Sequence, residues 1–359
     1  MDRTTVEVYE REAQRWVAER GRPRFADDAA ALAGRCEPGE WRADLGCGPG
    51  WHGPHLGRGG PVVSIDAARS MVGRIREHAP DAFGVVADLE ALPLRAGALG
   101  GAWASKSYQH VPMARLPLAL ADLHRSLHVG APAVIRVTSD RRIDERWNDE
   151  FGDRHFSYWP TDRLRAVLIG AGFSVDAIVD DGRDWLTASV RRELTLADVV
   201  GPALRMLIVG LNPSVYAAER GVGFARPGNR FWPALLASGL AERDREPLHA
   251  YRNFGIGFTD LVKRATARAD ELAPEEYVEG AERVRAFVEW LTPGAVCFAG
   301  LSGYRIAVDR HARAGWQAEP FGGRPAYVMP NPSGLNAHTN IADLAAHLRR
   351  AATPPRSTA

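Results

Sequence analysis

Two loops in the second half of the chain carry asparagine side chains in the same arrangement. In each loop an apolar run leads to Asn-Pro-Ser: Met206–Val209 leads to Asn212, and Ala326–Met329 leads to Asn331. A short apolar run that ends in a turn is typical of a buried parallel strand, and the loops after such strands meet at the carboxyl edge of a sheet. An asparagine amide does not deprotonate water near neutral pH, but it can hold a water molecule in place. The spacing therefore predicts two loops that face each other across a pocket whose chemistry depends on positioning.

A glycine-rich turn in the first half indicates a bound cofactor. Trp41–Leu45 has the composition of a strand, and Gly46-Cys47-Gly48-Pro49-Gly50 follows it. Glycines are needed where a ligand comes close to the main chain, because a Cβ atom would obstruct it. The next predicted strand, Val62–Ile65, ends at Asp66, and a carboxylate there suits a pair of ribose hydroxyls. Gly48-x-Gly50-x-x-Gly53 also matches the short dinucleotide fingerprint, so two kinds of nucleoside cofactor fit these residues.

The bulk composition limits the classes to which the chain can belong. Its 359 residues exceed one ordinary core, so we expect two domains. The chain is 45% hydrophobic and 25% charged, with no apolar run long enough to span a bilayer and no signal peptide at Met1–Arg3. We therefore expect no membrane partner and a cytoplasmic location. The cysteines are too few for a four-cysteine metal site, and we expect no metal: Cys36, Cys47 and Cys297.

Charge is distributed unevenly along the chain. The stretch Gly201–Ala359 contains 19 basic and 15 acidic residues, whereas the remainder contains 26 and 29. This mild basic excess is compatible with contacts to phosphates, but it is too small to identify a nucleic-acid-binding protein. All basic residues except Lys106 and Lys263 are arginines, which genome composition explains equally well.

The glycine turn belongs to a longer pattern. The strings DLGCGPG, VVSIDAARSM, VVADLEALPL and GAWASKSYQHV follow one another between Asp44 and Val111. Together they resemble the class I S-adenosylmethionine-dependent methyltransferases. The resemblance implies a seven-stranded Rossmann-like domain with a closing antiparallel hairpin and S-adenosylmethionine as its cofactor. It implies that the methionine part of the cofactor contacts Asp44 and Gly46, the ribose contacts Asp66 and the adenine contacts Asp88. The remaining residues that it assigns to cofactor binding are Gly48, Gly50 and Ser105.

The methyl acceptor does not follow from these strings. Methylation of an amino group on a DNA base would be indicated by Asn/Asp-Pro-Pro-aromatic after the fourth strand, where Ser105-Lys106-Ser107-Tyr108 stands instead. Methylation of cytosine C5 needs a Pro-Cys nucleophile, and the chain contains no such pair. His110 either acts as a general base or caps the following turn. Three tryptophans either line an acceptor pocket or pack in the core: Trp147, Trp159 and Trp185.

Helix and strand signals alternate in both halves. In the first half we expect helical structure within Asp2–Gly34, helices at Leu116–Leu127 and Thr161–Ile169, a strand at Ala133–Val137 and a hairpin over Phe173–Val190. In the second half we expect strands at Met206–Val209, Gly255–Phe258, Ala295–Ala299 and Ala326–Met329, and helices at Phe231–Ser238, Glu276–Leu291, Ser302–Arg310 and Ile341–Arg350. This alternation predicts two doubly wound α/β/α domains, the second with a smaller parallel sheet. The predicted bounds are 1–192 and 196–350, with a linker at 193–195 and a disordered tail at 351–359.

The second half contains four segments with a specific resemblance. In order they are GLNPS, GFARPGNRFWPALLASGL, GFTDLVKRATARADEL and MPNPSGLN. They resemble the mismatch-specific uracil-DNA glycosylases related to thymine-DNA glycosylase, over roughly Leu196–Arg350. The resemblance implies action on double-stranded DNA with G·U or related mismatches, without a cofactor. It assigns catalysis to Asn212, the base pocket to Gly210, Pro213, Ser214, Phe224, Asn229 and Asn331, and the DNA wedge to Ser333, Gly334, Leu335 and Asn336.

The residue types suit that chemistry. Cleavage of the bond between a base and deoxyribose builds positive charge on the sugar and negative charge on the departing base. Asn212 would hold the attacking water, so a good leaving group such as uracil should react best. Phe224 would stack on the flipped base, unless it belongs to the core. Asn331 would donate to a base carbonyl or steady the anion, and Leu335 would fill the space that the flipped nucleotide leaves.

Two residues carry predictions of their own. Ser214 stands where the family usually has glycine, close to the 5-position of a pyrimidine, so we predict discrimination against thymine. Strand cleavage through a Schiff base needs an amine, and Lys263 is the only lysine in this half. We expect Lys263 to contact phosphate or solvent and the glycosylase to be monofunctional.

Three functional hypotheses remain open. The first is a DNA repair glycosylase, acting in base excision repair, fused to a methyltransferase of unknown acceptor. In the second, one half is a non-catalytic module that only recognises DNA, or only binds its cofactor and regulates. In the third, the chain is primarily a small-molecule or RNA methyltransferase whose C-terminal domain only binds DNA. The sequence carries no signal for an oligomeric state.

Overall fold

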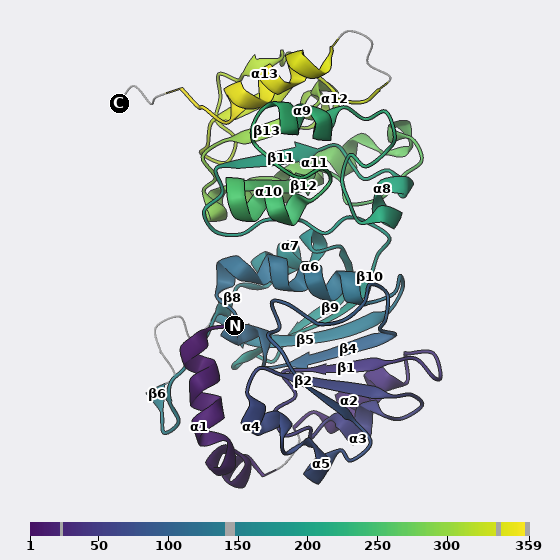
Figure 1. Cartoon of the computed structure of the whole chain (residues 1–359), viewed down its shortest axis with the longest axis vertical. Coiled ribbons are helices and arrows are strands. Elements are labelled where there is room, and N and C mark those ends of the chain that lie inside the picture. The colour runs from purple at the N-terminus through teal and green to yellow at the C-terminus, as the bar shows by residue number, and fades with distance from the viewer. Residues whose placement is uncertain (22–23, 141–147, 335–338, 356–359) are drawn as a thin grey trace. The chain divides into compact units, whose positions relative to one another are not determined.

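The chain forms two compact units in the computed structural model, which describes residues 1–21, 24–140, 148–334 and 339–355. One unit consists of Met1–Ile169 and Phe173–Glu193, and the other of Gly170–Gly172 and Leu194–Ala359 (Figure 1). The division after Glu193 falls inside the stretch predicted to join the domains. In the described part of the chain, no helix combines the length and apolar character needed to cross a membrane.

The first unit is built on an eight-stranded sheet in the order β3-β2-β1-β4-β5-β10-β9, with β8 paired to β5 beside this path. The first five strands in this order, from β3 to β5, run parallel to one another. The strand β10 is antiparallel to both β5 and β9. The predicted Rossmann-like sheet with its closing hairpin is therefore confirmed, and β8 is an addition. The strands are β1 (Arg42–Leu45), β2 (Val62–Asp66), β3 (Phe83–Val86), β4 (Gly101–Ser105), β5 (Pro132–Ser139), β8 (Tyr158–Trp159), β9 (Phe173–Asp180) and β10 (Trp185–Arg192), with a separate β6–β7 pair at Asn148–Asp149 and Gly152–Asp153.

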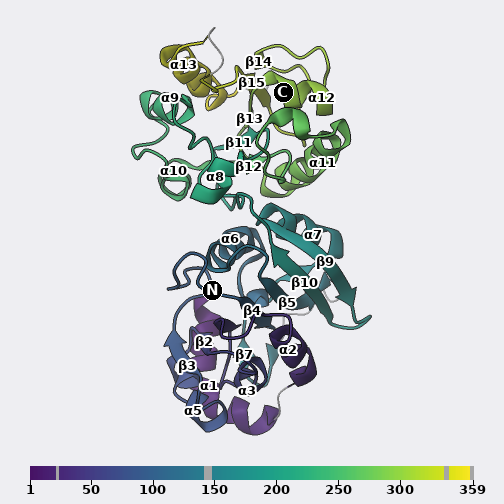
Figure 2. The same cartoon turned by 90° about the vertical axis from the view of Figure 1, so that its right-hand side faces the viewer.

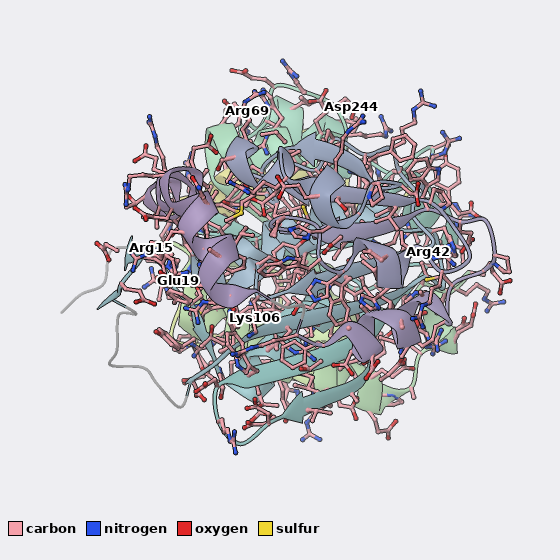
Figure 3. The ribbon with its side chains drawn as sticks, turned by 90° about the horizontal axis from the view of Figure 1, so that it is seen from below. Arg15, Glu19, Arg42, Arg69, Lys106 and Asp244 are labelled. Carbon is pink, nitrogen blue, oxygen red and sulfur yellow. The ribbon has the colours of Figure 1, made fainter. Side chains whose placement is uncertain are left out.

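The predicted helical stretch at the N-terminus is two helices. The first, α1 (Arg3–Arg20), begins after Asp2, whose carboxylate accepts a hydrogen bond from Thr5 N at 2.8 Å, and ends at Gly21 with φ 52°. Its exposed side carries the i,i+4 pair Arg15–Glu19 at 2.8 Å (Figure 3). The second is α2 (Ala26–Ala33). The remaining helices of this unit are α3 (Gly53–Leu56), α4 (Arg69–Val72), α5 (Ile75–His78), α6 (Leu116–Ser126) and α7 (Thr161–Gly170), with 3-10 turns at Tyr108–His110 and Met113–Arg115.

Apolar side chains of α2 and α3 pack on the sheet of the first unit. Leu32 of α2 and Leu56 of α3 form one buried cluster with Trp103 of β4 and Val134 of β5. All residues of β1 and β5 are buried, as expected for strands covered on both faces. This packing fixes the carboxyl ends of β1, β2 and β4, where the glycine turn and Asp66 lie.

The second unit has a five-stranded sheet in the order β12-β11-β13-β15-β14. Four strands are parallel, and β14 is antiparallel to β15. The predicted parallel sheet is confirmed, and β14 is an edge strand that the sequence pattern did not indicate. The strands are β11 (Met206–Gly210), β12 (Ile256–Asp260), β13 (Val296–Ala299), β14 (Gly315–Trp316) and β15 (Ala326–Met329).

Helices cover both faces of this second sheet. Figure 2 shows α9, α10 and α13 on one side of it and α11 and α12 on the other. Leu344 of α13 shares a buried core with Phe231 of α9 and Ile208 of β11. The bounds are α8 (Val215–Arg220), α9 (Phe231–Ala237), α10 (Pro247–Phe254), α11 (Pro274–Leu291), α12 (Leu301–Ala307) and α13 (Ile341–Ala351), with a 3-10 turn at Ala269–Glu271.

The end of α13 lies beyond the predicted domain boundary at Arg350. Ala351 is helical, and both Ala351 and Ala352 belong to the buried core. The predicted tail therefore begins at least two residues too early, because small apolar side chains here pack on the sheet.

Candidate active sites

Asn212 follows β11 and has a fixed carboxamide. Its Nδ2 donates to Thr266 Oγ1 at 2.8 Å, to the Arg264 carbonyl at 3.0 Å and to its neighbouring Pro213 carbonyl at 3.1 Å. The amide nitrogen is thereby turned toward the protein. The amide oxygen is left as the atom that can accept a hydrogen bond from a water molecule.

Thr266 links the Asn212 loop to the loop after β12. Its backbone nitrogen donates to Pro213 O at 3.1 Å, and its carbonyl accepts from Val215 N at 3.2 Å. The Thr266 side chain is buried, so its hydroxyl is held against Asn212. Sequence reasoning missed this positioning residue, although it lies inside the segment GFTDLVKRATARADEL.

A carboxyl group lies beside Gly210 at the end of β11. A Cβ atom on Gly210 would come within 2.2 Å of Asp260 Oδ1 and 3.5 Å of Phe224 Cζ. The absence of a side chain at Gly210, which was predicted to serve the base pocket, is therefore needed to accommodate the Asp260 side chain. Burial raises the pKa of Asp260 to about 6. This titratable group beside Gly210 was not predicted, because Asp260 and Gly210 belong to different strands.

Phe224 has one ring face covered by protein. It stacks on Phe231 with ring centroids 4.1 Å apart and an interplanar angle of 19°. Its φ of 57° is uncommon for a residue with a side chain. Only the face opposite Phe231 can receive a base, so Phe224 both packs on the core and presents an aromatic surface.

Arg230 holds the Asn331 loop against the loop that leads into α9. Its backbone nitrogen donates to Pro332 O at 3.0 Å, and its guanidinium donates to Ser333 O at 2.8 Å and to the Thr339 carbonyl. Gly334 also lies against the loop before α9, because a Cβ atom on Gly334 would lie 2.6 Å from Gly228 O. The structure thus brings the Asn331 loop against the loop that contains Asn229. Leu335 and Asn336, the predicted wedge tip, lie outside the described residues.

The oxygens of the other two pocket asparagines are used within their own loops. Asn229 Oδ1 accepts from Phe231 N at 2.9 Å, at the start of α9. Asn331 Oδ1 accepts from Ser333 N at 2.9 Å, and the Asn331 side chain is exposed. Both oxygens thereby stabilise the local backbone.

Ser214 is the N-cap of α8. Its Oγ accepts from Ala217 N at 3.2 Å. Serine is a favourable residue at this position because its hydroxyl satisfies a free N–H group of the first helical turn. The hydroxyl therefore has a structural role in addition to any effect of the Cβ atom on the pocket.

The prediction that Lys263 contacts phosphate or solvent is wrong. Its side chain is only 11% exposed, and Nζ lies 2.7 Å from Oδ1 of buried Asp198. Arg283 pairs with the other oxygen of Asp198 at 2.9 Å, and Thr259 donates to Oδ1 at 2.8 Å. A buried carboxylate needs such partners, and this requirement fixes the amine.

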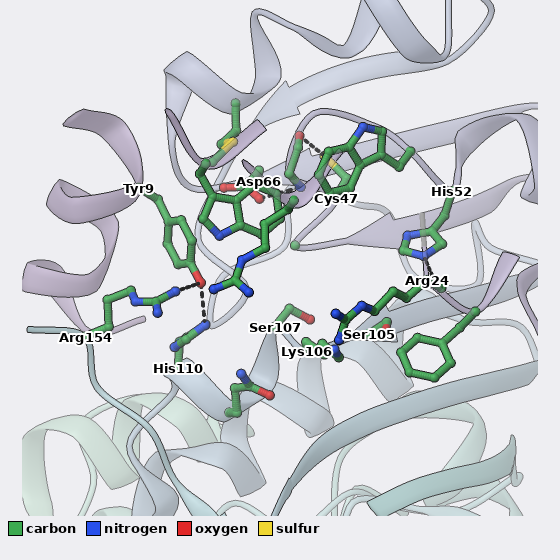
Figure 4. Close-up of a pocket in the computed structure, with 18 of the residues that line it drawn as sticks. Tyr9, Arg24, Cys47, His52, Asp66, Ser105, Lys106, Ser107, His110 and Arg154 are labelled. Carbon is green, nitrogen blue, oxygen red and sulfur yellow. Dashed lines mark hydrogen bonds between the residues drawn. The ribbon is translucent and has the colours of Figure 1, made fainter. Parts of the chain in front are cut away.

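In the first unit, Gly46 and Gly48 line a cavity of about 230 Å³ (Figure 4). Gly46, Gly48 and Gly50 have φ values of 67°, 54° and 90°, which favour glycine. A Cβ atom on Gly46 would come within 2.2 Å of Ser107 Cβ. The turn therefore needs glycine for its own packing, and its main chain borders the cavity.

Asp66 lines the same cavity and supports the turn. One carboxylate oxygen accepts from Gly48 N and the other from Ala68 N, both at 2.9 Å. Burial raises the pKa of Asp66, while these two backbone donors lower it. Asp66 is thus placed at the end of β2 with its carboxylate fixed, as a contact to ribose hydroxyls requires.

Three other predicted cofactor residues lie away from the cavity wall. Asp44 is buried beneath the turn, and burial, reinforced by the charge of Asp66, raises its pKa to about 8. Gly50 faces Ile75 of α5. Asp88 is exposed, and both of its carboxylate oxygens lie 2.6 Å from the amino nitrogen of Met1. Direct cofactor contacts by these three residues stay predictions.

The cavity contains polar atoms suited to a ligand. Ser105, Ser107 and Gln109 line it. In the described part of the chain, Ser107 Oγ and Gln109 Oε1 have no hydrogen-bond partner although both atoms are buried. Such atoms are normally satisfied in folded proteins. Together with the glycine turn and Asp66, they fit a polar nucleoside cofactor.

His110 is the centre of a short hydrogen-bond chain on another part of the wall. Its Nδ1 donates to the His155 carbonyl at 2.7 Å, so its Nε2 is the acceptor for the Tyr9 hydroxyl at 3.1 Å. Arg154 donates to the same hydroxyl at 2.8 Å. Burial lowers the pKa of His110 to about 4, so the ring is neutral at pH 7. Instead of capping the following turn, one of the two predicted roles, the His110 ring joins Tyr9 of α1 to the loop that contains His155.

The tryptophans divide between the two predicted roles. Trp185 lines the cavity, whereas Trp159 is completely buried. Trp147 lies outside the described residues. Trp16 and Trp51, which sequence reasoning did not select, also line the cavity and stack on each other with centroids 5.1 Å apart.

Comparison with known families agrees with the two folds. Residues 197–351 match the family model described as the uracil DNA glycosylase superfamily, and residues 43–130 match the model described as a methyltransferase domain. The chain therefore carries an N-terminal methyltransferase domain and a C-terminal domain of the uracil-DNA glycosylase superfamily.

Solved structures with similar folds include two methyltransferases. An S-adenosylmethionine-dependent methyltransferase from Mesorhizobium loti is 21% identical, with a TM-score of 0.39, and the match covers 46% of this chain and all of that one. A TehB-like methyltransferase from Corynebacterium glutamicum is 21% identical, with a TM-score of 0.40, and the match covers 54% of this chain and 100% of the other.

Proposed function

We propose that the C-terminal domain is a monofunctional glycosylase that removes uracil, and other altered pyrimidines, from mispaired duplex DNA in base excision repair. The main supporting observation is the fixed amide of Asn212, whose nitrogen has three acceptors. Its oxygen is left to hold a water molecule. An orienting group of this kind suits a reaction in which the leaving group departs readily and the nucleophile needs only placement.

The reaction follows from the charges that develop. The target nucleotide is flipped out of the duplex, and the base stacks on the free face of Phe224. Water held by Asn212 attacks the anomeric carbon as the glycosidic bond breaks, and the proton that this water loses passes to the departing base. Asn331, on the loop that would face the base, would steady the anion that forms before this proton arrives. Leu335 would fill the vacated space in the duplex, and Asn336 would face the orphaned base.

Absence of strand cleavage is part of this proposal. A lyase reaction needs an amine that can attack the sugar. The amine of Lys263 is buried in an ion pair with Asp198. We therefore expect an abasic site, and no strand break before alkali treatment.

The N-terminal domain is proposed to transfer a methyl group from S-adenosylmethionine. Gly46 and Gly48 would lie along the cofactor, Asp66 would hold its ribose, and Ser105 and Ser107 would border the reacting end. The bound cofactor supplies an electrophilic methyl group on a positively charged sulfur. The domain then needs to align the acceptor and exclude water, which a partly enclosed aromatic cavity does.

An end-labelled duplex with a single G·U pair tests the glycosylase proposal. The full chain and Asn212→Ala are incubated with this duplex and with a matched G·C duplex, and the products are treated with alkali. Wild type should produce a break only at uracil, and the variant should lower the rate by at least about 100-fold. No alkali-sensitive site with wild type would contradict the proposal. A break that appears before alkali would contradict its monofunctional part.

A further inference from the structure

The sheet order separates two ends of the methyltransferase cavity. Asp66 ends β2, on one side of β1. Lys106 follows β4 on the other side, and Trp185 begins β10, which pairs with β5. Figure 4 shows Lys106, Ser105 and Arg24 together, apart from Asp66. The ribose-binding carboxylate and the Lys106 end are thus at different strands of the same edge.

Cations predominate on the cavity wall. Of the described residues that line it, Arg20, Arg24, Lys106 and Arg154 are cationic, and Asp66 is the one carboxylate. Asp66 ends β2, whereas Lys106 follows β4 on the other side of β1, and within the described residues no ion pair joins the two side chains.

Lys106 is held in place by its backbone and by aromatic rings. Its φ is 63°, and its nitrogen donates to Arg136 O at 2.9 Å. Nζ lies 4.1 Å from the ring centroid of Trp185 and 5.2 Å from that of Phe25. Among the residues that the structure describes, no carboxylate lies within ion-pair distance of Nζ. Phe25 also has a positive φ, 67°, so strained backbone on two sides supports this arrangement.

Arg136 is buried next to the Lys106 end of the cavity. It pairs with Asp28 at 2.7 Å, donates to Thr187 Oγ1 at 2.8 Å, and lies 3.5 Å from the centroid of Phe25. Its charge is used within the protein, and it fixes the aromatic wall. Lys106 and the exposed Arg24 are left to meet a ligand.

The pKa of Lys106 agrees with this crowding of cations. Burial, together with the charges of Arg24, Arg136 and Arg20, lowers its pKa to about 8, against a smaller opposing effect of Asp184. Cations gathered at one place repel each other unless a negative group joins them. A bound anion would relieve that repulsion.

We propose that Lys106 and Arg24, framed by Trp185 and Phe25, bind an anionic group of the methyl acceptor, which is a small organic carboxylate or phosphate. The inference rests on the proposed methyl transfer. The cavity is partly enclosed and an aromatic ring lies beside Lys106, which suits a small organic anion. Cationic amines are disfavoured as acceptors because the same charges repel them.

The cofactor itself carries a carboxylate, so the test must separate two sources of the anion. Binding is measured by calorimetry on the full chain with S-adenosylhomocysteine, and with 5′-methylthioadenosine, which lacks the carboxylate. The protein saturated with S-adenosylhomocysteine is then titrated with 4-hydroxybenzoate, phenyl phosphate and the neutral 4-hydroxybenzamide. Lys106→Met and Arg24→Met are compared with Arg69→Met, a change of an exposed arginine on α4 away from the cavity wall.

The proposal expects at least one anionic probe to bind about tenfold or more tighter than the neutral amide. Lys106→Met and Arg24→Met should each lose that preference, with S-adenosylhomocysteine affinity within about twofold of wild type, and Arg69→Met should keep it. Equal binding of charged and neutral probes, or no binding of any anionic probe, overturns the proposal. A tenfold loss of S-adenosylhomocysteine affinity in Lys106→Met, with 5′-methylthioadenosine affinity unchanged, also overturns it and assigns the cations to the cofactor. Failure of wild type to bind S-adenosylhomocysteine refutes the proposed methyl transfer itself.

Discussion

The two candidate sites lie at the carboxyl edges of parallel sheets, yet they are built from different groups. Around Asn212 the key contacts are those of an amide to carbonyls and a hydroxyl, and the nearest lysine is buried in an ion pair. In the methyltransferase cavity, cations, aromatic rings and one carboxylate form the wall. A site centred on a fixed amide suits a reaction limited by placement of water, and a charged cavity suits selection of a ligand by charge. The predictions that follow test this difference, from the largest expected effect to the smallest.

Substitution Gly46→Ala should abolish cofactor binding. The new Cβ atom would come within 2.2 Å of Ser107 Cβ at a φ of 67°. We expect S-adenosylhomocysteine affinity, measured by calorimetry, to fall at least about 100-fold, equivalent to about 2.7 kcal/mol. Gly97→Ala is the matched control because Gly97 has the same φ and its Cβ atom would meet open space. A similar loss in both variants would show that backbone strain, and not the clash, is responsible.

Substitution Thr266→Val should slow uracil excision about tenfold by freeing the Asn212 amide to rotate. It removes the acceptor at 2.8 Å and keeps the side-chain shape. The readout is the single-turnover rate on a G·U duplex. A positioning role also predicts that Thr266→Val has no further effect in an Asn212→Ala background. Additive effects in the double variant would contradict that role.

Asp260 should make excision dependent on pH. Its pKa is raised to about 6, so it is neutral below that pH and negative above it. A negative Asp260 opposes the charge that develops on the departing base, so the wild-type rate should rise several-fold as pH falls from about 7.5 to 5.5. Asp260→Asn should flatten this profile. An unchanged profile in the variant would remove Asp260 from the reaction.

The same raised pKa has a consequence for stability. An acid whose pKa is higher in the folded state than in the unfolded state binds more protons when folded. The destabilisation is absent below the ordinary aspartate pKa of 3.8, grows up to about pH 6 and is complete above it. Asp260→Asn should therefore stabilise the domain at pH 7.5 and have no such effect at pH 4, as measured by urea unfolding.

Ser214 separates the effect of a Cβ atom from that of a helix cap. Ser214→Ala keeps Cβ and loses the bond to Ala217 N, at a cost of about 1 kcal/mol, whereas Ser214→Gly costs only a few tenths. If the Cβ atom narrows the pocket, Gly should raise the thymine rate relative to uracil several-fold and Ala should not. Equal wild-type rates on G·U and G·T duplexes would contradict the predicted discrimination.

Sequence reasoning worked where one segment carries the information. The two sheets, the position of Asn212 and the glycine turn follow from contiguous strings, because a strand and the loop after it are local features. Thr266 and Asp260 were missed because they reach the Asn212 loop from β12 and the loop after it, which only the sheet order places next to β11. The Lys106 end was missed for the same reason, since Arg24, Lys106 and Trp185 are far apart in the chain.

Some predicted site residues are used by the fold itself, because they are buried in the core or bonded to the local backbone. Asp44 sits beneath the turn, since every residue of β1 is buried. Ser214 caps α8, and Asn229 Oδ1 accepts from Phe231 N at the start of α9; a single sequence does not distinguish such roles from ligand contact. Residue type alone therefore predicts which groups are available, whereas burial and hydrogen bonds decide which of them are left for a ligand.

The central claim is that the chain contains two separate sites, with Asn212 as the residue that places water in one of them. Single-turnover uracil release from a G·U duplex should be compared for wild type, Asn212→Ala and Gly46→Ala. We predict equal rates, within about twofold, for wild type and Gly46→Ala, and a rate at least about 100-fold lower for Asn212→Ala. Uracil release by Asn212→Ala at the wild-type rate, or none by wild type, would contradict the account.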